Sequence, residues 1–171
     1  MHARRTEYAA WAEHAAWMRE ALAEAALALE AGEVPVGAVV VRGNQMIARA
    51  HNAREASADP TAHAEMLAIR RAAATLGAWR LAGCSLYVTL EPCPMCAGAI
   101  VYSRLDAVFY GAADTRAGCC GSLYRLTEDP AFAHDVPAHG GLLAAPCEAL
   151  LTRFFAAKRP NAKGGPTSCE L

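Results

Sequence analysis

The first part of the chain combines a long helical pattern with a short hairpin pattern. Over residues 7–31, apolar side chains recur at spacings of three and four positions, which predicts an amphipathic helix that Gly32 ends. The apolar positions on this stripe are Trp11, Ala15, Met18, Leu22, Ala25 and Leu29. A continuous apolar run follows at 34–41, and a polar turn at 42–45 separates it from a second run at 46–50, so we expect a β-hairpin.

Strand-like and helix-like segments alternate along the rest of the chain. Thr61 can cap a helix over 62–76 that Gly77 stops, and we expect short buried strands at 85–90 and 106–110. The alternation indicates a layered α/β domain in which some strands pair in parallel. The remaining expected segments are helices over 94–104 and 146–158 and irregular loops over 51–60, 111–121 and 126–141.

Length and composition fit a single folded domain. The 171 residues carry a net charge of −1 and 54% hydrophobic side chains, which excludes intrinsic disorder. We expect this domain over residues 1–159 and a flexible tail over 160–171. No apolar run approaches the roughly 18 residues of a membrane span, and the first residues lack the apolar core of a secretory signal. We therefore expect a cytoplasmic protein with no membrane partner. The balanced charge argues against a protein that coats nucleic acid by bulk positive charge.

The cysteine content points to a reducing compartment. Seven cysteines are present, an odd number that cannot form a complete set of disulfides. Cys84 and Cys147 lie in apolar surroundings typical of a core, and Cys169 lies in the tail. Cys119 and Cys120 are adjacent in a glycine-flanked loop, where a vicinal pair makes a poor disulfide. The two remaining cysteines have a spacing that suits a metal ion.

Cys93 and Cys96 are three positions apart at a predicted helix start, so their sulfurs share one face. The free N–H groups of that terminus favour thiolate, the form that binds zinc. His63 lies far upstream, but the predicted helix and the returning strand bring both helix starts to the carboxyl edge of the sheet. These three side chains predict one zinc ion with a position left for water, which zinc activates near neutral pH.

Glu65 lies two positions after His63, in the first turn of the predicted helix. We expect its carboxylate to lean over the open position and to move a proton from water to a substrate nitrogen. Two plainer roles compete with this interpretation. A histidine in an alanine-rich helix often serves packing alone, and a first-turn glutamate often only complements the helix dipole. The cysteine pair at this spacing favours the metal site.

These residues form a pattern, His63-Ala64-Glu65 followed by Pro92-Cys93-Pro94-Met95-Cys96, that resembles the signature of zinc-dependent nucleobase and nucleoside deaminases. Within this group the chain resembles the bacterial tRNA adenosine deaminases, from about the first helix to Arg159. The segments that carry this likeness are Val34-Pro35-Val36-Gly37-Ala38, Asp59-Pro60-Thr61-Ala62, Leu90-Glu91, Tyr110-Gly111-Ala112-Ala113-Asp114 and Gly118-Cys119-Cys120-Gly121-Ser122-Leu123.

The resemblance implies a three-layer α/β/α fold of the cytidine-deaminase type, with a mixed central sheet and helices on both faces. It implies one zinc ion per subunit on His63, Cys93 and Cys96, a homodimer, and a tRNA anticodon stem-loop as partner. The implied reaction is hydrolytic conversion of the wobble adenosine to inosine, with attack at C6 of adenine. Glu65 then gives a proton to the ring nitrogen and to the departing amino group.

The resemblance also implies a substrate pocket. Asn52 matches a position that hydrogen-bonds the extruded nucleoside, and Pro35, Val36 and Leu90 match positions in the pocket wall. An asparagine in a loop more often makes an Asx turn with its own backbone, so this role for Asn52 stays open.

Two further residues match contacts to the flanking nucleotides. Asp114 matches a contact to the nucleotide beside the target, and Phe155 matches an aromatic position near the flanking bases. Asp114 can instead cap a turn, and Phe155 can belong to the core, as we expect for Phe154. The family often has a basic residue where this chain has Ala113, and Arg116 is positioned to compensate.

Several functions remain open from the sequence. The runner-up is a deaminase of a free base or nucleoside, of guanine or cytosine type, that uses the same zinc and glutamate. A non-catalytic zinc module is a third possibility and predicts a fourth protein ligand. The C-terminal stretch from Arg153 to Lys163 lacks acidic residues and can track phosphates, or it can simply be a solvated face with a basic last turn.

The predicted helix over 94–104 is a candidate dimer surface. Its apolar face at Met95, Ile100 and Val101 suggests a contact with a second copy. The same expectation puts Tyr102, Ser103 and Arg104 near the partner's site.

Overall fold

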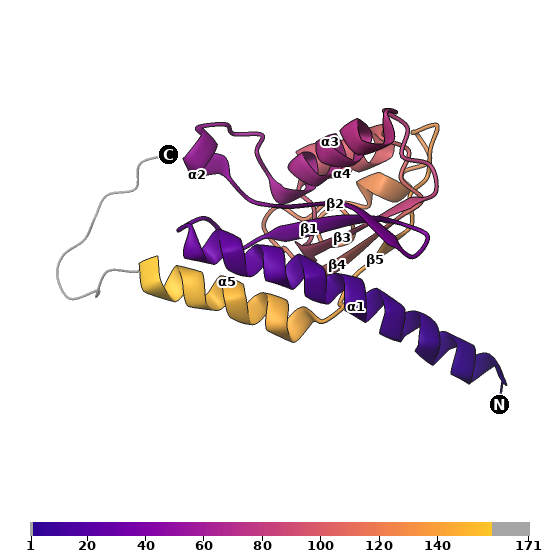
Figure 1. Cartoon of the computed structure of the whole chain (residues 1–171), viewed down its shortest axis with the longest axis horizontal. Helices are drawn as coiled ribbons and strands as arrows, with labels where there is room; N and C mark the ends of the chain where they lie inside the picture. The colour runs from indigo at the N-terminus through magenta and orange to yellow at the C-terminus, as the bar shows by residue number, and fades with distance from the viewer. Residues whose placement is uncertain (1, 159–171) are drawn as a thin grey trace.

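The computed structural model describes the backbone of residues 2–158 and the side chains of residues 11–158 (Figure 1). The helices are α1 (His2–Glu30), α2 (Arg54–Ser57), α3 (Ala64–Leu76), α4 (Pro94–Tyr102) and α5 (Ala144–Lys158), with a short 3-10 helix η1 (Leu126–Glu128). The strands are β1 (Gly37–Arg42), β2 (Gln45–His51), β3 (Cys84–Leu90), β4 (Ala107–Ala112) and β5 (Ala138–His139).

The strands form one mixed sheet in the order β2-β1-β3-β4-β5. β1 pairs antiparallel with both β2 and β3, whereas β3, β4 and β5 run parallel. Helices α1 and α5 cover one face of the sheet, and α3 and α4 cover the other (Figure 1). This arrangement confirms the three-layer α/β/α prediction and the parallel pairing.

Successive side chains along the strands point to opposite faces of the sheet, and this divides the core into two layers. Val40 and Leu86 pack toward α3 and α4. Val39, Tyr87 and Phe109 point the other way, toward α1 and α5. Because both faces are covered, the central strands are buried along nearly their whole length, which explains why they appear as continuous apolar runs in the sequence.

Several element boundaries differ from the prediction, and two of them bear on the site. The helix expected over 62–76 begins at Ala64 with His63 as its N-cap, because Thr61 donates its hydroxyl and its N–H to Asp59 instead. The helix expected over 94–104 ends at Tyr102, and Arg104 adopts a left-handed conformation with φ of 60°. The predicted loops contain α2, η1 and β5, whose short lengths leave little periodicity to detect.

The expected cysteine roles hold where the structure describes them. Cys84 and Cys147 are buried in the two core layers, and Cys119 and Cys120 are buried free thiols. Cys169 lies outside the described residues, as does the predicted tail over 160–171.

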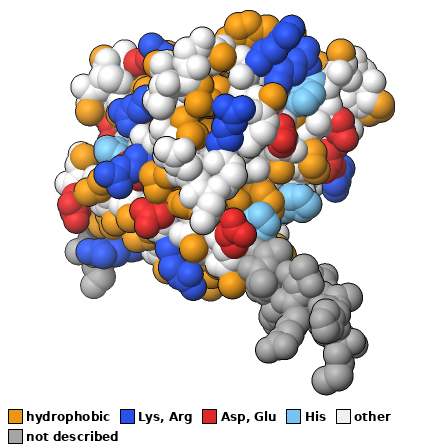
Figure 2. All heavy atoms as spheres, turned by 45° about the vertical axis from the view of Figure 1, so that its right-hand side comes forward, with side chains coloured by type: hydrophobic (Ala, Val, Ile, Leu, Met, Phe, Trp, Pro, Cys, Tyr) orange, Lys and Arg blue, Asp and Glu red, His pale blue; other side chains and the backbone are white. Residues whose placement is uncertain are grey.

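The surface in Figure 2 mixes charges of both signs with apolar patches, and no broad field of one sign covers that face. This pattern agrees with the net charge of −1. None of the helices in the described part of the chain is both long enough and apolar enough to cross a membrane.

Candidate active site

The two helix starts meet at the carboxyl end of β3, as the topology requires. The chain runs away from this edge of the sheet along α3, returns to it along β3, and starts α4 there. His63 is the N-cap of α3, Cys93 is the N-cap of α4, and Cys96 lies in the first turn of α4. The ligand atoms of these three residues all lie within 4.8 Å of one another, which brings the predicted ligands together.

The geometry of this group suits a tetrahedral metal ion. His63 Nδ1 lies 3.7 Å from Cys93 Sγ and 3.5 Å from Cys96 Sγ. Zinc bonds of about 2.3 Å to sulfur and about 2.0 Å to nitrogen, at the tetrahedral angle, separate the sulfur and nitrogen atoms by about 3.5 Å. Among the described residues, the group consists of these three donors and has no fourth protein ligand. The donor set is therefore of the open kind that leaves room for water.

The two thiols differ in acidity because they share a hydrogen bond. The Cys96 thiol stabilises a thiolate at Cys93, and His63 adds to this, so the pKa of Cys93 falls to about 4. The same contact raises the pKa of Cys96 far above its usual range. Hydrogen bonding to Cys93 also raises the pKa of His63. This contact therefore favours the anionic form of Cys93, the form that attracts a cation.

Glu65 is the second residue of α3 and is 4% exposed. It lines the same cavity as His63 and Cys93. Burial raises the pKa of Glu65 to about 7, although the nearby His63 opposes that rise. A carboxyl group whose pKa lies near neutrality can both accept and return a proton, which suits general acid–base chemistry.

The cavity over these residues has a volume of about 180 Å³. Its apolar walls come from five residues: Val34, Val36, Ala64, Leu90 and Ala117. Its polar lining, beyond the metal-ligand group and Glu65, comes from Asn52, Arg54, Glu91 and Asp114. Four of the six predicted substrate contacts therefore lie in this cavity: Val36, Asn52, Leu90 and Asp114.

The two other predicted contacts lie elsewhere. Pro35 is buried beside the cavity wall but does not line it. Phe155 is 49% exposed and lines a separate groove of about 510 Å³ on α5, which Arg116 and Lys158 also line. Phe154 is buried, as expected for a core residue. The exposed Phe155 is therefore not a core residue.

The structure also decides between the alternative roles of two polar residues. Asn52 makes no Asx turn, because no backbone N–H of the described residues donates to its Oδ1; its Nδ2 donates to Glu33 Oε2 at 3.0 Å. Asp114 does cap a turn, since its Oδ1 accepts from the N–H groups of Arg116 and Ala117 at 2.9 and 3.1 Å. Asp114 nevertheless lines the cavity, so the two roles coexist.

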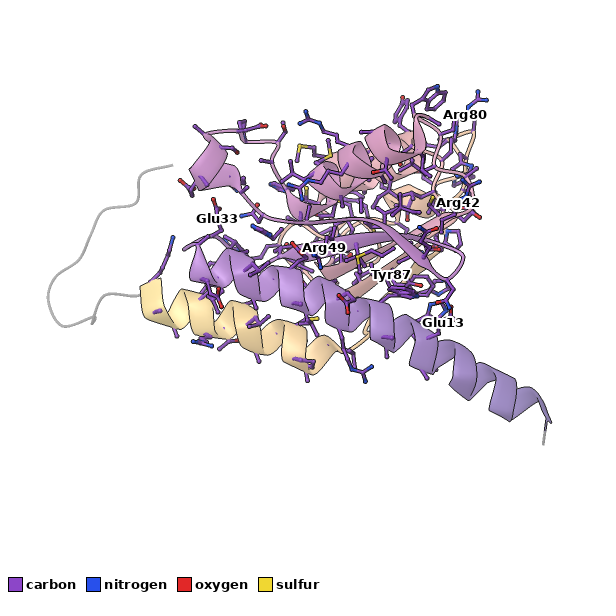
Figure 3. The ribbon with its side chains drawn as sticks, viewed as in Figure 1. Glu13, Glu33, Arg42, Arg49, Arg80 and Tyr87 are labelled. Atoms are coloured by element: carbon purple, nitrogen blue, oxygen red, sulfur yellow. The ribbon has the colours of Figure 1, made fainter. Side chains whose placement is uncertain are left out.

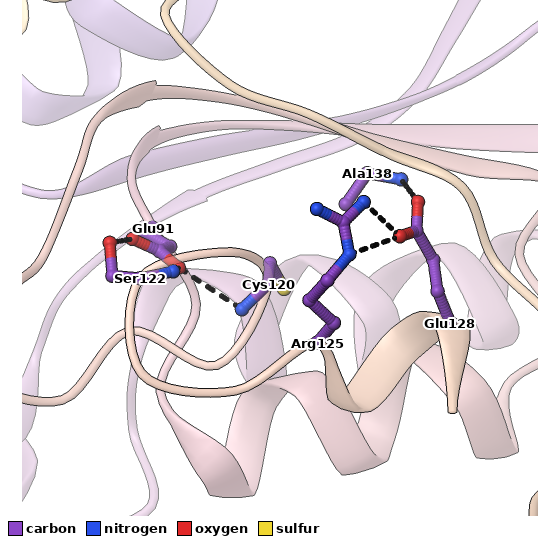
Figure 4. Close-up of polar contacts among 6 residues, drawn as sticks. All are labelled: Glu91, Cys120, Ser122, Arg125, Glu128 and Ala138. Carbon is purple, nitrogen blue, oxygen red and sulfur yellow. Dashed lines mark hydrogen bonds and ion pairs between the residues drawn. The ribbon is translucent and has the colours of Figure 1, made fainter.

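Glu91 is a residue of the site that the sequence reasoning missed. Its buried carboxylate accepts hydrogen bonds from the N–H groups of Cys120 at 3.1 Å and Ser122 at 2.8 Å and from the Ser122 hydroxyl (Figure 4). It also accepts from the N–H of Asp114 at 3.0 Å. Burial opposes ionisation, but these hydrogen bonds outweigh it and lower the pKa of Glu91. Glu91 thereby holds the loop that supplies Asp114 to the cavity. Its position directly before Pro92 in the motif was the sequence signal that could have identified it as a site residue.

Arg54 and Glu33 were missed as well. Arg54 comes from the short helix α2, which lies in a predicted loop. Glu33 follows α1 and reaches the cavity only through Asn52, so its place near the site depends on tertiary structure.

One dimer expectation needs correction. Ile100 and Val101 do not form an outer face, because both are buried in this chain's own core along with most of the Ser103 side chain. The outward side of α4 instead carries Tyr102, which is 71% exposed, and Gly98, where an added Cβ meets nothing within 4 Å.

The known proteins that this chain is similar to include deaminases. A family model for MafB19-like deaminases matches residues 12–129. A tRNA-specific adenosine deaminase of Bacillus subtilis (strain 168) is 50% identical over 147 residues, which cover 86% of this chain and 91% of the relative.

Two solved structures are also similar. One comes from work on A-to-I editing by tRNA:A34 deaminases at the wobble position of transfer RNA. It is 43% identical, has a TM-score of 0.76, and the match covers 79% of this chain and 98% of that chain. The other is a guanine deaminase from Bacillus subtilis, 37% identical with a TM-score of 0.57, where the match covers 87% of this chain and 96% of that chain.

Proposed function

The chain belongs to the family of tRNA-specific adenosine deaminases, and from this membership we propose that it converts adenosine to inosine at the wobble position of a tRNA anticodon. The observation that carries the proposal is the convergence of His63, Cys93 and Cys96 on one point, with buried Glu65 on the same cavity. A purine-binding cavity beside a metal-ligand group and a proton carrier is what hydrolytic deamination needs.

We assign the metal as zinc, one ion per subunit, held by His63 Nδ1 and the sulfurs of Cys93 and Cys96. The imidazole and thiolate donors and their spacing fit this ion. When bound, zinc supplies Lewis-acid activation of water near neutral pH. The N-cap position of Cys93 adds the favourable field of a helix terminus to the anionic site.

Glu65 carries the protons of the reaction. Deamination adds a water oxygen at C6 of adenine and releases the amino group as ammonia. The Glu65 carboxylate takes a proton from that water, passes it to N1 of the ring, and delivers the second proton to the leaving amino group. Its burial keeps these transfers out of bulk solvent and sets a pKa suited to both directions.

The cavity walls hold the base, and polar groups hold the rest of the nucleotide. Val36 and Leu90 offer apolar contacts to the faces of an extruded purine. Asn52 and Asp114 offer hydrogen bonds at the rim, and Pro35 supports the wall from behind. A tRNA substrate also implies the cytoplasm as the site of action and one catalytic domain over residues 1–159.

A groove beside the cavity favours a polynucleotide over a free base. Arg116 lies on the Asp114 loop, and it lines this groove together with Phe155 and Lys158. An exposed aromatic ring with flanking cations suits stacking on a base next to phosphates. Deamination of free guanine is the second candidate, because a guanine deaminase shares the fold at 37% identity.

We propose a homodimer through the outward side of α4. Tyr102 is a large, mostly exposed side chain on this helix, and the open space over Gly98 allows a second copy to approach closely. The proposal includes the expectation that the end of α4, with Tyr102, lies near the partner's cavity.

The direct test incubates the zinc-loaded protein with a synthetic anticodon stem-loop and reads the wobble base by sequencing, since inosine is read as guanosine. We expect conversion of the stem-loop and none of free adenosine. Faster turnover of free guanine would support the second candidate instead.

Glu65→Gln provides the mechanistic control. It preserves the size of the side chain, so zinc content and folding should be retained while turnover falls by roughly 10³-fold or more, near the upper part of the range for one acid–base group. His63→Ala should lose zinc as well, as metal analysis of the purified variant will show. Turnover by Glu65→Gln within about tenfold of the unsubstituted enzyme would favour a non-catalytic zinc module.

A further inference from the structure

Asn52 is held in one orientation by its surroundings. The residue is 5% exposed, and its backbone N–H donates to Val36 O at 2.9 Å. Its side-chain Nδ2 donates to Glu33 Oε2 at 3.0 Å. The backbone and the amide are therefore both fixed at the point where β2 delivers Asn52 to the cavity wall.

Glu33 determines which end of this amide faces it. Glu33 is 2% exposed and lies just beyond α1, beneath α2 (Figure 3). Its other oxygen, Oε1, accepts from the N–H of Ala56 at 2.8 Å. An ionised carboxylate only accepts hydrogen bonds, so it selects the NH₂ end of Asn52 and repels the oxygen end. A flipped amide would place two acceptors against each other in a buried site.

The carbonyl oxygen of Asn52 is consequently left for a ligand. Asn52 Oδ1 accepts no hydrogen bond from the described residues. The fully buried side-chain atoms without a partner do not include it, so this oxygen is accessible to solvent. Because Asn52 lines the cavity, the group that it offers there is an acceptor. The complementary group on the ligand must be a hydrogen-bond donor.

An adenosine within an RNA strand has few donors. Its amino group is the leaving group and must face Glu65 and the metal ligands. Its 3′ and 5′ oxygens are esterified and carry no hydrogen. The 2′-hydroxyl is the remaining donor, and it is also the group by which a protein distinguishes RNA from DNA.

We propose that Glu33 is a positioning residue that keeps Asn52 Oδ1 turned toward the substrate, where it accepts a hydrogen bond from the 2′-hydroxyl of the target nucleotide. The Glu33–Asn52 pair then selects ribose over deoxyribose at the target position. The inference rests on the proposed function, because it takes an RNA adenosine as the substrate.

The test compares three synthetic stem-loops that differ only at the 2′ position of the target adenosine: hydroxyl, hydrogen and fluorine. Fluorine occupies the place of the hydroxyl but cannot donate. We expect kcat/KM to fall roughly tenfold with either replacement, the effect of one lost hydrogen bond to a buried partner, and mainly through KM.

Variants of the pair then change the hydroxyl-to-fluorine ratio of kcat/KM. In Glu33→Gln, the new amide keeps its oxygen on Ala56 and turns its NH₂ toward Asn52, so the Asn52 amide flips and presents a donor to the cavity. The ratio should fall from roughly tenfold to about threefold or less, because a donor no longer requires a hydroxyl hydrogen. Adding Asn52→Asp to this variant gives the new amide an acceptor partner, restores an oxygen toward the substrate, and should return the ratio to roughly tenfold.

A matched control uses the neighbouring acid. Glu24 is also buried, and it accepts from His51 Nδ1 at 2.8 Å, one residue before Asn52. Glu24→Gln removes a similar charge from the same region without touching Asn52, so the ratio should stay at the value of the unsubstituted enzyme. Zinc content and melting temperature, measured for every variant, identify any general loss of structure, which would lower kcat/KM for all three substrates equally.

The outcomes distinguish a failure of this inference from a failure of the proposed function. Conversion of the hydroxyl and fluorine substrates at equal rates by the unsubstituted enzyme overturns the inference and leaves the proposed function standing. An unchanged ratio in Glu33→Gln, or a ratio that the double variant does not restore, also overturns it. Failure to convert the all-ribose stem-loop refutes the proposed function itself.

Discussion

Gly37 lets β1 pack directly against the backbone of α1. A Cβ added there would lie 2.1 Å from Ala21 O, 2.4 Å from Ala25 N and 2.8 Å from Glu24 Cβ. The first two atoms belong to the helix backbone, which has no rotamer to change. Since Cβ contacts below about 3 Å do not occur in practice, Gly37→Ala must push the strand and the helix apart by about 1 Å.

The cost of that displacement follows from core overpacking, which is typically about 1–3 kcal/mol. We expect the upper end, about 3 kcal/mol, because the closest contacts are with helix backbone. For a domain of this size, each kcal/mol lowers the melting temperature by about 2–4 °C, so the expected shift is roughly 6–12 °C. The assay is thermal denaturation of the zinc-loaded protein followed by circular dichroism, with urea denaturation as a second measure.

Gly111 supplies the comparison. A Cβ there would meet Cys147 Sγ at 2.3 Å and Thr89 O at 2.9 Å, so the worst contact is with the end of a side chain. Gly111→Ala should therefore regain part of its lost stability when Cys147→Ala is added, whereas no side-chain truncation can relieve Gly37→Ala. A melting temperature for Gly37→Ala within about 2 °C of the unsubstituted protein would refute the packing argument.

The remaining predictions concern assembly, pH and metal. Tyr102→Glu should convert a dimer to a monomer in light scattering, because it places a charge on the proposed interface; an unchanged mass contradicts that interface. Hydrogen bonding from the Ala138 N–H, aided by Arg125, lowers the pKa of Glu128 against the opposing effect of burial (Figure 4). Its stabilising contribution is thus present above the ordinary glutamate pKa and is lost as pH falls through the folded value. Glu128→Gln should be less stable than the parent near neutral pH, and the gap in urea denaturation should close in acid. Dialysis against a chelator should lower the melting temperature, and added zinc should restore it, since a ligand that binds the folded state stabilises it by about 2.7 kcal/mol at a hundred times its Kd.

Local patterns predicted the parts of the site that are set by neighbours in sequence. The spacing of Cys93 and Cys96 at a helix start, and the return of the chain from α3 through β3, were sufficient to bring His63 to the two sulfurs. The strands were equally clear, because both faces of the sheet are covered and the apolar runs are continuous. The cap of α3 was misplaced, since Thr61 satisfies Asp59 in the preceding turn and leaves the N-cap position to His63.

The residues that escaped prediction act across the fold. Glu33 meets Asn52 only because the segment after α1 lies against the end of β2. Glu91 meets Cys120 and Ser122 only because the loop after β4 folds back over the end of β3. A single glutamate in a sequence shows neither its burial nor its partners, so no periodicity or spacing could have revealed these contacts.

Two buried glutamates of the cavity show how one site assigns different tasks to the same side chain. Glu91 accepts four hydrogen bonds from a folded loop, and they lower its pKa, so it stays ionised and serves as an anchor. Burial instead raises the pKa of Glu65 to about 7, which leaves its proton mobile. Groups whose environments push their pKa values apart take separate roles in catalysis. This contrast supports Glu65 rather than Glu91 as the proposed proton carrier. A substitution at Glu91 should act through the shape of the Asp114 loop rather than through proton transfer.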